Sequence, residues 1–541
     1  MGQGGVCGYI ARSASPRLSV MASDAPLPLG EYVELRYRVR SSFPGSVAEG
    51  VERVALAMVS GASYEPAVPE SVISYTSPRQ GNVESVKISY TKLYVVSELS
   101  DNGTEPPRYP IPPGTPVMLA TRETLARVYG GVEFGVRLGM LVPRSLGVEV
   151  RVNPDKLAKH LLIAGATGSG KSNTVAVLAD RLSALGAPVV IFDVHGEYNM
   201  IPEDGDTSRV HVVEAKINPL KMHPKILASI VVPEPQARSQ RRLLAKAMAG
   251  LLRELRGRME EENLSLVPAL QRLVEEKLAG RKAEPVLEEE GEGGDQVRQL
   301  VKGLRDILVA EVGRLARRSE DRDARNVASK VAEKLEEFFD TAPVTVTGEL
   351  PTAHISPGRI LVVDASALTD EERRWVLKLI VDAILKKLKA GALQPTVLVV
   401  EEAPLFISAS KEHPVKESLQ RFAREARKFG GCLIVVSQRP RSLDVNVVSQ
   451  LQNFVFLRMV QQEDIRVVMD IADNLDENLA STIPSLPDGR AIVMGEWVGR
   501  FPAVVDIDLH RGKRVGTTPP LTEIWMRSKA QIVRQQFSLD L

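Results

Sequence analysis

The sequence predicts an α/β protein in three parts: a core of alternating strands and helices, a small β-barrel before the core, and a helical bundle inserted into it. Three observations lead to this prediction. Short Val/Ile/Tyr-rich runs broken by turn residues dominate residues 28–150. Apolar strands alternate with helical spacing in residues 151–220 and 346–510, whereas residues 221–345 are helical and strongly charged. At 541 residues, the chain is too long for one hydrophobic core.

The composition is ordinary for a soluble globular protein, with 44% hydrophobic residues, 25% charged residues and a formal net charge of +1. Any surface that binds a polyanion therefore has to be local. Cys7 and Cys432 are too few for a disulfide framework, which favours a reducing compartment and a cytoplasmic location. No apolar run approaches the roughly 18 residues that span a bilayer, so we expect no membrane segment.

The first 150 residues divide into two expected parts. Residues 1–27 are rich in Gly, Ser and Ala and lack an apolar signal core, so we expect a disordered extension there. Beyond them, Val33, Leu35 and Tyr37 alternate with charged residues, as in a half-buried strand. Short strands separated by frequent turns predict that residues 28–150 form a small β-barrel.

A complete phosphate-binding loop opens the core. Residues 161–173 read LLIAGATGSGKSN, in which an apolar strand leads into the full glycine-rich motif. Apolar residues then recur at helical spacing, so a helix begins at the loop. Its free N–H groups and the Lys171 ammonium are expected to bind the phosphates of ATP, and the Ser172 hydroxyl to bind Mg²⁺. The expected nucleotide contacts of the loop are Gly165, Ala166, Thr167, Gly168, Ser169, Gly170, Lys171, Ser172 and Asn173.

Residues 221–345 interrupt the core. Several segments within them show helical spacing with many charges, and a polar gap rich in Glu and Gly separates these segments at 288–294. The gap favours a folded-back helical bundle over one long coiled arm. The core resumes at 346–510, and the polar residues 511–541 are expected to form a C-terminal tail.

Acidic residues end three predicted strands of the core, at Asp193, Asp364 and Glu401, and only Glu401 is followed directly by a second acid, Glu402. A nucleotide hydrolase needs such a pair, because one carboxylate orients water on Mg²⁺ and the next polarises the attacking water. We therefore assign Glu401 to the metal and Glu402 to the general base, with Asp193 in a supporting or water-binding position near the nucleotide. The alternative is that the two glutamates only open a helix, which Pro404 permits.

Two further features complete the expected catalytic site. Gln438 follows the predicted strand 432–437, where an amide can sense the γ-phosphate; a plain turn residue is the alternative. Together with the paired glutamates, Gln438 predicts a core in which an extra strand separates the phosphate-loop strand from the metal strand. Arg424 and Arg427 lie three apart on the preceding helix, either as a solvated basic face or as arginines presented to a neighbouring subunit's nucleotide.

Several of these segments together resemble the HerA–FtsK family of ring-shaped DNA translocases, and most closely its archaeal HerA branch. The order of parts also matches: a small β-barrel, a RecA-like P-loop NTPase core, a helical insertion and a C-terminal tail. The phosphate loop alone is unspecific, whereas the combination is specific. The matching segments are KH at 159–160, the loop at 165–173, DVHGEY at 193–198, EEAP at 401–404, REARKFG at 424–430 and SQRP at 437–440.

The resemblance implies a homohexamer with ATP and Mg²⁺ bound between subunits, a central channel for double-stranded DNA, and a partner nuclease of the NurA type in DNA end resection for recombinational repair. It implies that Arg424 or Arg427 acts on a neighbouring subunit's nucleotide, and that the tail at 511–541 contacts a neighbouring subunit. It also implies nucleotide contacts from Lys159, where the family often has arginine, and from Arg500, near the adenosine.

Two other functions remain open from the sequence. An ATPase motor for another polymer, of the secretion or conjugation coupling type, shares the core, although we expect no membrane segment to anchor this chain. The second is a nucleotide-binding switch without motor activity. The pair Glu401-Glu402 argues against a switch, because a switch can do without its own base. A duplex-stimulated ATPase rate separates the three functions.

Overall fold

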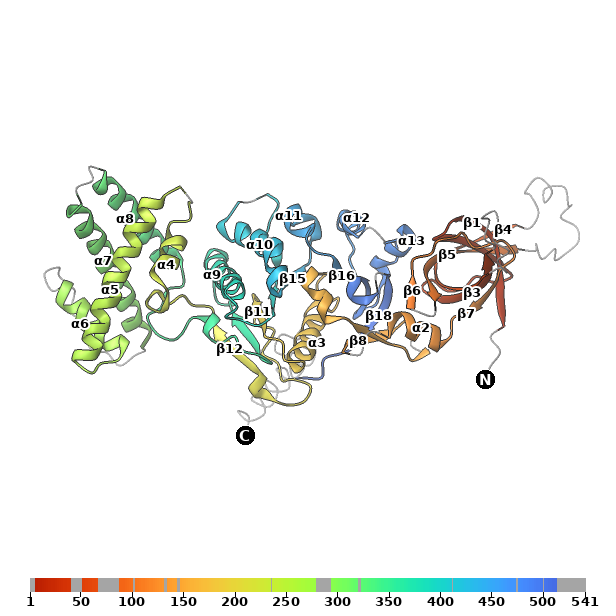
Figure 1. Cartoon of the computed structure of the whole chain (residues 1–541), viewed down its shortest axis with the longest axis horizontal. Helices are drawn as coiled ribbons and strands as arrows, with labels where there is room; N and C mark the ends of the chain where they lie inside the picture. The colour runs from red at the N-terminus through yellow and green to blue at the C-terminus, as the bar shows by residue number, and fades with distance from the viewer. Residues whose placement is uncertain are drawn as a thin grey trace, which may run out of the picture.

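The computed structural model gives an elongated molecule of three parts (Figure 1). A β-barrel lies at one end, an eleven-stranded sheet with its helices lies in the middle, and a helical bundle lies at the other end. The tail expected at 511–541 lies outside the described residues from position 513 onward. The residues described are 5–39, 51–66, 87–100, 103–130, 134–143, 146–234, 236–278, 293–319, 323–410, 412–472, 475–499 and 501–512.

Six strands close the barrel. β2 pairs with β1 on one side and with β5 on the other, so the order β2-β1-β7-β3-β4-β5 returns to its start, and β6 pairs with β5 outside this ring. Val33, Leu35 and Val95 are fully buried in its interior. The strands are β1 (Val6–Ser15), β2 (Leu18–Ser23), β3 (Tyr32–Val39), β4 (Val51–Pro66), β5 (Lys87–Ser100), β6 (Gly103–Glu105) and β7 (Pro116–Leu119).

Residues 6–23, expected within a disordered extension, form the first two strands of this barrel, so that expectation was wrong. Ile10 and Met21 belong to the barrel core and are 2% and 0% exposed. Gly8 lies so close to the neighbouring strand that a Cβ atom there would be 2.6 Å from the carbonyl oxygen of Ala22. A small residue is therefore needed at this pairing, which composition alone does not distinguish from disorder.

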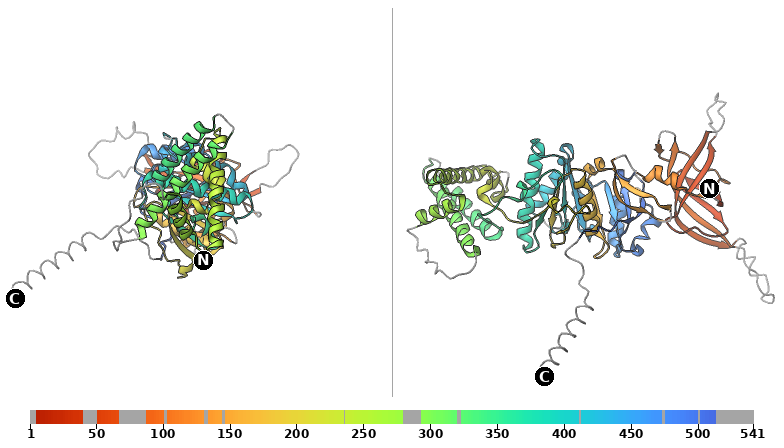
Figure 2. Two further views of the ribbon diagram at one scale, coloured as in Figure 1. Left: turned by 90° about the vertical axis from the view of Figure 1, so that its left-hand side faces the viewer. Right: turned by 90° about the horizontal axis from the view of Figure 1, so that it is seen from below.

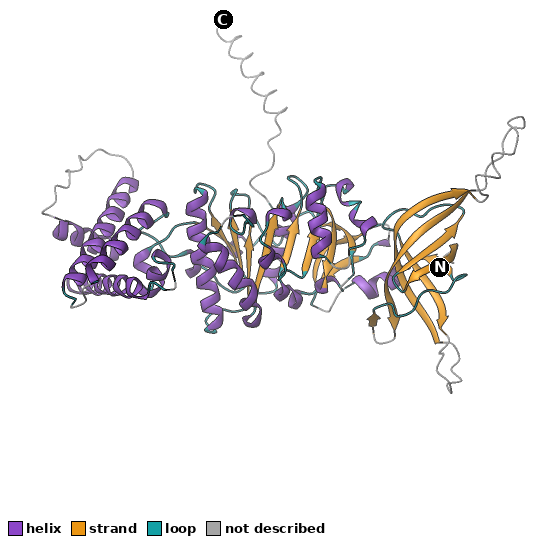
Figure 3. Ribbon diagram, turned by 90° about the horizontal axis from the view of Figure 1, so that it is seen from above, coloured by secondary structure: helices purple, strands orange, loops and turns teal. Residues whose placement is uncertain are grey.

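The middle sheet has the strand order β12-β13-β11-β14-β15-β10-β16-β17-β18-β8-β9. The strands from β12 to β16 are parallel, and every residue of β10, β11, β14 and β15 is buried because helices cover both faces (Figure 3). β15 separates β10 from β14, which confirms the predicted extra strand. The strands are β8 (Val136–Leu141), β9 (Glu149–Val152), β10 (Leu161–Ala164), β11 (Val189–Asp193), β12 (Val210–Glu214), β13 (Ile360–Asp364), β14 (Thr396–Val400), β15 (Gly431–Ser437), β16 (Asn453–Phe456), β17 (Arg490–Gly495) and β18 (Ala503–Ile507).

β8 and β9 belong to this sheet, although we expected residues 28–150 to form one barrel domain. β8 pairs with β18, with Met140 opposite Asp506, and β9 pairs with β8. The two strands approach closely, since a Cβ atom on Gly139 would lie 2.1 Å from the carbonyl oxygen of Asp506. The pairing joins segments near opposite ends of the chain, so the local sequence pattern could not assign β8 to a sheet.

Helices of the core begin at strand ends. α3 (Lys171–Ala184) starts directly after the phosphate loop. α9 (Asp370–Lys389) starts at a capping box, in which Thr369 accepts a hydrogen bond from the Glu372 N–H and Glu372 accepts one from Thr369. α10 (Pro414–Glu425) precedes β15. The remaining α-helices among the described residues outside the bundle are α2 (Arg122–Tyr129), α11 (Val445–Val448), α12 (Gln462–Ile471) and α13 (Glu477–Ala480).

The inserted helical bundle is confirmed and lies beyond β12, the edge strand of the sheet (Figure 2). The chain leaves and re-enters the core where Ile217 and Val344 form a parallel bridge. In the described ranges, no helix combines the length and apolar character needed to cross a membrane. The helices of the bundle are α4 (Pro224–Val231), α5 (Arg238–Glu261), α6 (Leu266–Leu278), α7 (Gly293–Arg317) and α8 (Ala324–Thr341).

Candidate active site

The phosphate-binding loop lies at the carboxyl edge of the sheet, between β10 and α3. Gly168 and Gly170 have φ angles of 77° and 110°, in the left-handed region that favours glycine. At Gly165, an added Cβ would lie 2.8 Å from the Cβ of Leu457, so the loop also needs glycine for space. These three glycines let the backbone N–H groups of the loop surround a phosphate.

Lys171 is half-buried at the start of α3, and its Nζ donates a hydrogen bond to the carbonyl oxygen of Ala166 at 2.9 Å. Burial lowers the pKa of this ammonium, while the charges of Glu402, Glu401 and Glu197 act to raise it. The charges of these three carboxylates therefore act on the lysine. A nucleotide phosphate at the loop would compete for the same ammonium.

Glu401 is buried at the end of β14, with 4% of its surface exposed. Burial raises its pKa to about 8; the hydrogen bond from Tyr198 lowers it, and the charges of Asp193, Glu197 and Glu402 raise it. Tyr198 donates its O–H to Glu401 Oε1, whereas the buried Oε2 has no hydrogen-bond partner among the described residues. An unpartnered buried carboxylate oxygen is the kind of atom that a cation or its water completes.

These residues fit the Mg²⁺ that the family resemblance implies. The Ser172 hydroxyl donates to Glu197 Oε2 at 2.7 Å, so a second carboxylate lies beside the expected metal-binding hydroxyl. Among the described residues, no group of three or more His, Cys, Asp or Glu side chains could hold a metal by itself. Mg²⁺ is usually held by one or two protein oxygens together with substrate phosphates and water, and the Ser172 hydroxyl and Glu401 Oε2 can supply such oxygens.

Glu402 differs from its neighbour in both backbone and surroundings. Its φ and ψ of 42° and 49° are left-handed, an unusual conformation for glutamate, and its side chain is 21% exposed. Gln438 donates its side-chain N–H to Glu402 Oε1, and His195 Nε2 lies 3.5 Å from the same oxygen. Thr167 of the phosphate loop donates its hydroxyl to Gln438 Oε1 at 2.7 Å. A continuous polar chain therefore runs from the phosphate loop through Gln438 to Glu402.

Asp193 supports the site without facing the phosphate loop. Its Oδ1 accepts the backbone N–H groups of His195 and Gly196 at 3.1 and 2.9 Å, and its Oδ2 accepts that of Tyr198 at 3.0 Å. Burial raises the pKa of this carboxyl, and the four backbone N–H groups around it oppose that shift. The carboxylate thus fixes the loop that follows β11, and this loop contains Glu197 and Tyr198, which contact other residues of the site.

The sequence showed His195, Glu197 and Tyr198 as part of a motif but gave them no separate role. In the structure, all three contact an assigned residue: His195 lies beside Glu402, Glu197 binds Ser172, and Tyr198 binds Glu401. The sequence feature that could have identified them as site residues is their position just after Asp193, at the end of β11. Because β11 and β14 are adjacent parallel strands, residues just beyond their carboxyl ends meet at one edge.

Lys159, Arg424 and Arg427 lie at the opposite, amino edge of the sheet. Lys159 ends the 3₁₀ helix η2 (Pro154–Lys159) before β10 and forms an ion pair with Glu496 at 2.6 Å. Arg424 in α10 and Arg427 in η7 (Ala426–Phe429) are exposed, and neither side chain has a hydrogen bond or ion pair with another described residue. The strand β15 spans about 20 Å between these arginines and Gln438. The structure therefore does not bring these three cations to the phosphate loop of their own chain.

Two other expected nucleotide contacts have different outcomes. The Asn173 side chain donates to the carbonyl oxygen of Asp508 at 2.8 Å and accepts from the N–H of His510 at 3.0 Å. The side chain therefore anchors the segment after β18 to α3, and the nucleotide contact expected of Asn173 stays a prediction. Arg500 lies outside the described residues.

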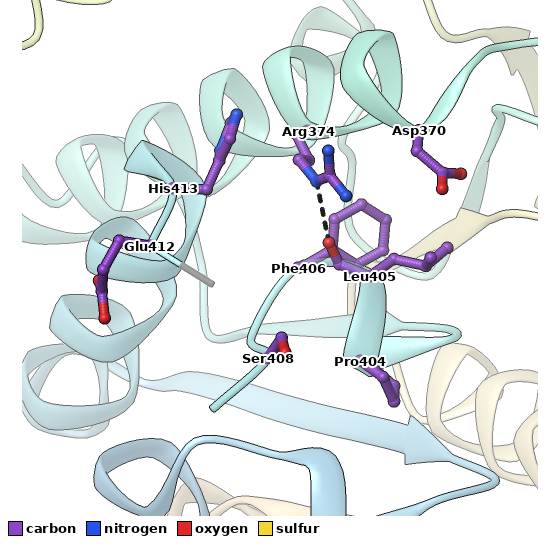
Figure 4. A pocket seen from close by; sticks show the side chains of 8 residues that line it. All are labelled: Asp370, Arg374, Pro404, Leu405, Phe406, Ser408, Glu412 and His413. Atoms are coloured by element: carbon purple, nitrogen blue, oxygen red, sulfur yellow. Dashed lines mark hydrogen bonds between the residues drawn. The ribbon is translucent and has the colours of Figure 1, made fainter. Parts of the chain in front are cut away.

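A separate pocket of about 200 Å³ lies behind the backbone that follows Glu402 (Figure 4). Arg374 of α9 donates its Nε–H to the carbonyl oxygen of Leu405 at 3.0 Å, which holds η6 (Ala403–Leu405) against that helix. No residue of the phosphate loop lines this pocket, so it is not the nucleotide site. It is lined by Asp370, Arg374, Pro404, Leu405, Phe406, Ser408, Glu412 and His413.

Comparisons with solved structures and with protein families find similar proteins. Among solved structures, VirB4 of Thermoanaerobacter pseudethanolicus is similar with a TM-score of 0.45 and 16% identity, covering 70% of this chain and 98% of that chain. The family model described as Helicase HerA, central domain, matches residues 136–386, a range that begins with β8.

Two proteins named DNA double-strand break repair helicase HerA are similar over most of their length. The one from Sulfolobus acidocaldarius is 33% identical over 459 residues, covering 83% of this chain and 84% of that protein. The one from Sulfurisphaera tokodaii is 29% identical over 536 residues, covering 97% and 98% respectively. The chain therefore belongs to the HerA helicase family of ATP-hydrolysing enzymes.

Proposed function

We propose that this protein is an ATP-driven translocase and helicase that moves double-stranded DNA through a homohexameric ring in the cytoplasm. We propose further that it works with a nuclease of the NurA type in DNA end resection for recombinational repair. Membership of the HerA family supports the proposal, because two relatives in that family are named for DNA double-strand break repair. The geometry of the site gives independent support.

One observation supports the ring most directly: the charged groups of the site lie on opposite edges of one sheet. Lys171 and Glu402 lie at the carboxyl edge, whereas Arg424 and Arg427 are exposed at the amino edge without an acidic partner among the described residues. In a head-to-tail ring, the amino edge of one subunit can face the carboxyl edge of the next. The arginines would then reach the neighbour's γ-phosphate, so each complete site needs two subunits.

Within one subunit, we assign Lys171 to the β- and γ-phosphates, and Ser172 with Glu401 to Mg²⁺. Bound there, Mg²⁺ would supply positive charge to neutralise the phosphate oxygens. Glu402 accepts the proton of the attacking water, because it is the carboxylate of the pair that reaches solvent. Gln438 connects Thr167 to Glu402, so a γ-phosphate that exchanges with its hydrogen bonds would release the base for catalysis.

The experiment that tests the proposal measures ATP hydrolysis by the wild-type protein with linear duplex DNA, with single-stranded DNA and without DNA. We expect duplex DNA to raise kcat most. Lys171→Ala is the control for contaminating ATPases and should abolish both nucleotide binding and hydrolysis. A wild-type protein that hydrolyses ATP at a rate that duplex DNA does not change would contradict the DNA motor. A motor for another polymer would then be favoured.

A further inference from the structure

The exposed side of α5 in the bundle carries a basic face that has no acidic partner among the described residues. Arg238, Arg242, Lys246, Arg253 and Arg256 are all exposed there, and none forms an ion pair with a described residue. At 100° per residue these five positions fall within about 80° of arc, so they form one row along the helix. We call this row the α5 stripe.

The stripe lies on the opposite side of α5 from its buried face. Leu244, Met248, Leu251 and Leu255 are buried against the rest of the bundle, and they are centred about half a turn away from the stripe. The stripe therefore does not contribute to packing of the bundle. Its length from Arg238 to Arg256 is about 27 Å at 1.5 Å per residue.

Several other cations of the bundle have local acidic partners. Arg258 pairs with Glu276, Lys277 pairs with Glu254, and Lys334 pairs with Glu234 at 2.6 Å. By contrast, Arg238, Arg242 and Lys246 follow one another at intervals of four, where like charges destabilise a helix. A solvated surface needs no such row, since mixed charges would keep the helix just as soluble. The repeated positive charge is explained if a linear polyanion neutralises it.

We propose that the α5 stripe binds the phosphate backbone of double-stranded DNA outside the ATPase core. Duplex DNA carries one negative charge per about 1.7 Å of axis, so a row of about 27 Å faces a continuous series of phosphates. Ala249 is the one apolar residue within this arc, and the row has no aromatic side chain on which a base could stack, so binding is independent of sequence. This inference rests on the proposed function, because duplex DNA is the polymer of the proposed motor.

The test compares duplex binding by the full-length protein and by a triple variant, Arg242→Gln, Lys246→Gln and Arg253→Gln. Binding of a labelled blunt duplex is measured without nucleotide over a series of KCl concentrations. We expect affinity about tenfold or more weaker near 0.1 M salt, and a slope of log K against log[KCl] that is shallower by about 0.9 for each lost phosphate contact. ATPase activity without DNA should stay unchanged, because the stripe lies outside the catalytic site.

The matched control removes three exposed bundle cations that lie outside the stripe: Arg317→Gln, Arg325→Gln and Lys330→Gln. It should bind duplex as the wild type does. The inference is overturned if duplex DNA binds and stimulates the wild type while the α5 variant keeps the same affinity and the same salt slope. An acidic protein surface would then be the partner to test. If the wild type neither binds duplex nor is stimulated by it, the proposed function itself fails.

Discussion

Glu401 and Glu402 are adjacent in sequence, yet their carboxylates have opposite environments. Glu401 is buried, receives the Tyr198 hydroxyl and has a pKa raised to about 8. Glu402 leaves the strand with a left-handed backbone and meets Gln438 and His195 at its surface. On this difference we base the proposal that the inner residue binds the cation and the outer one takes the proton.

Substitution of each glutamate by glutamine separates the two roles. Glu402→Gln should retain ATP binding and lose about 10²-fold or more in kcat, the usual scale of a lost general base. Glu401→Gln can still accept the Tyr198 hydrogen bond, so we expect it to fold and to need more Mg²⁺ for half-maximal activity. The measurement is a Mg²⁺ titration of steady-state ATPase rates for both variants. A near wild-type kcat for Glu402→Gln would remove Glu402 from the role of base.

The sequence could predict the site residues that a local pattern marks, but not the contacts between segments that are distant in the chain. Glu401, Glu402 and Gln438 come directly after a strand, and Lys171 follows β10 across the short phosphate loop. Parallel strands bring such positions to one edge. The hydrogen bonds of the loop after Asp193 depend on which strands are adjacent in the sheet, and no local sequence pattern predicts strand order. For the same reason, the sequence could not show that Lys159 pairs with Glu496.

At the scale of elements, one buried histidine joins the phosphate-loop strand to the arginine-bearing helix. His160 precedes β10, donates its Nε2–H to the carbonyl oxygen of Ala423 at 2.8 Å, and accepts the N–H of Leu433 on Nδ1 at 3.0 Å. This pattern requires the neutral ring. Burial lowers its pKa to about 4; the hydrogen bond to Ala423 opposes the shift and the charge of Arg427 adds to it.

The neutral His160 makes stability depend on pH. In the unfolded chain this histidine takes up a proton below its ordinary pKa of about 6.5, whereas in the folded chain it does so only below about pH 4. The free energy of unfolding therefore falls as the pH falls from about 6.5 to about 4. At pH 5 the loss is about 2 kcal/mol relative to pH 7. His160→Gln removes this titration while keeping an N–H donor. We expect thermal unfolding midpoints that fall less between pH 7 and pH 5 for the variant than for the wild type, and equal falls would contradict this role.

The fold was predictable where the sequence pattern is strong and local. Continuous apolar strands followed by helical spacing identified the parallel core, and the charged helical stretch identified the bundle. The sequence did not predict β1 and β2, because glycine at position 8 is required by a close approach of two strands that only the closed barrel reveals. The sequence did not assign β8 to the middle sheet, because its partner strand, β18, lies near the other end of the chain.

At the scale of the whole molecule, barrel, sheet and bundle lie in a line, and the catalytic groups lie across that line on the two edges of the sheet (Figure 1). One subunit therefore offers a phosphate loop at one edge and unpaired arginines, Arg424 and Arg427, at the other. The central claim of this account is that neighbouring subunits complete each other's site.

The most direct test mixes two inactive proteins, Lys171→Ala and the double variant Arg424→Ala with Arg427→Ala. Loss of both arginines should cost about 10³-fold or more in kcat while nucleotide binding survives, as with other arginine fingers. Arg421→Ala is the matched control, since Arg421 is exposed on the same helix but pairs with Asp382 of its own chain at 2.6 Å. In mixed rings, some interfaces join an intact loop to intact arginines, so the account predicts that ATPase activity partly returns. A mixture no more active than its separate components, despite verified subunit exchange, would contradict it.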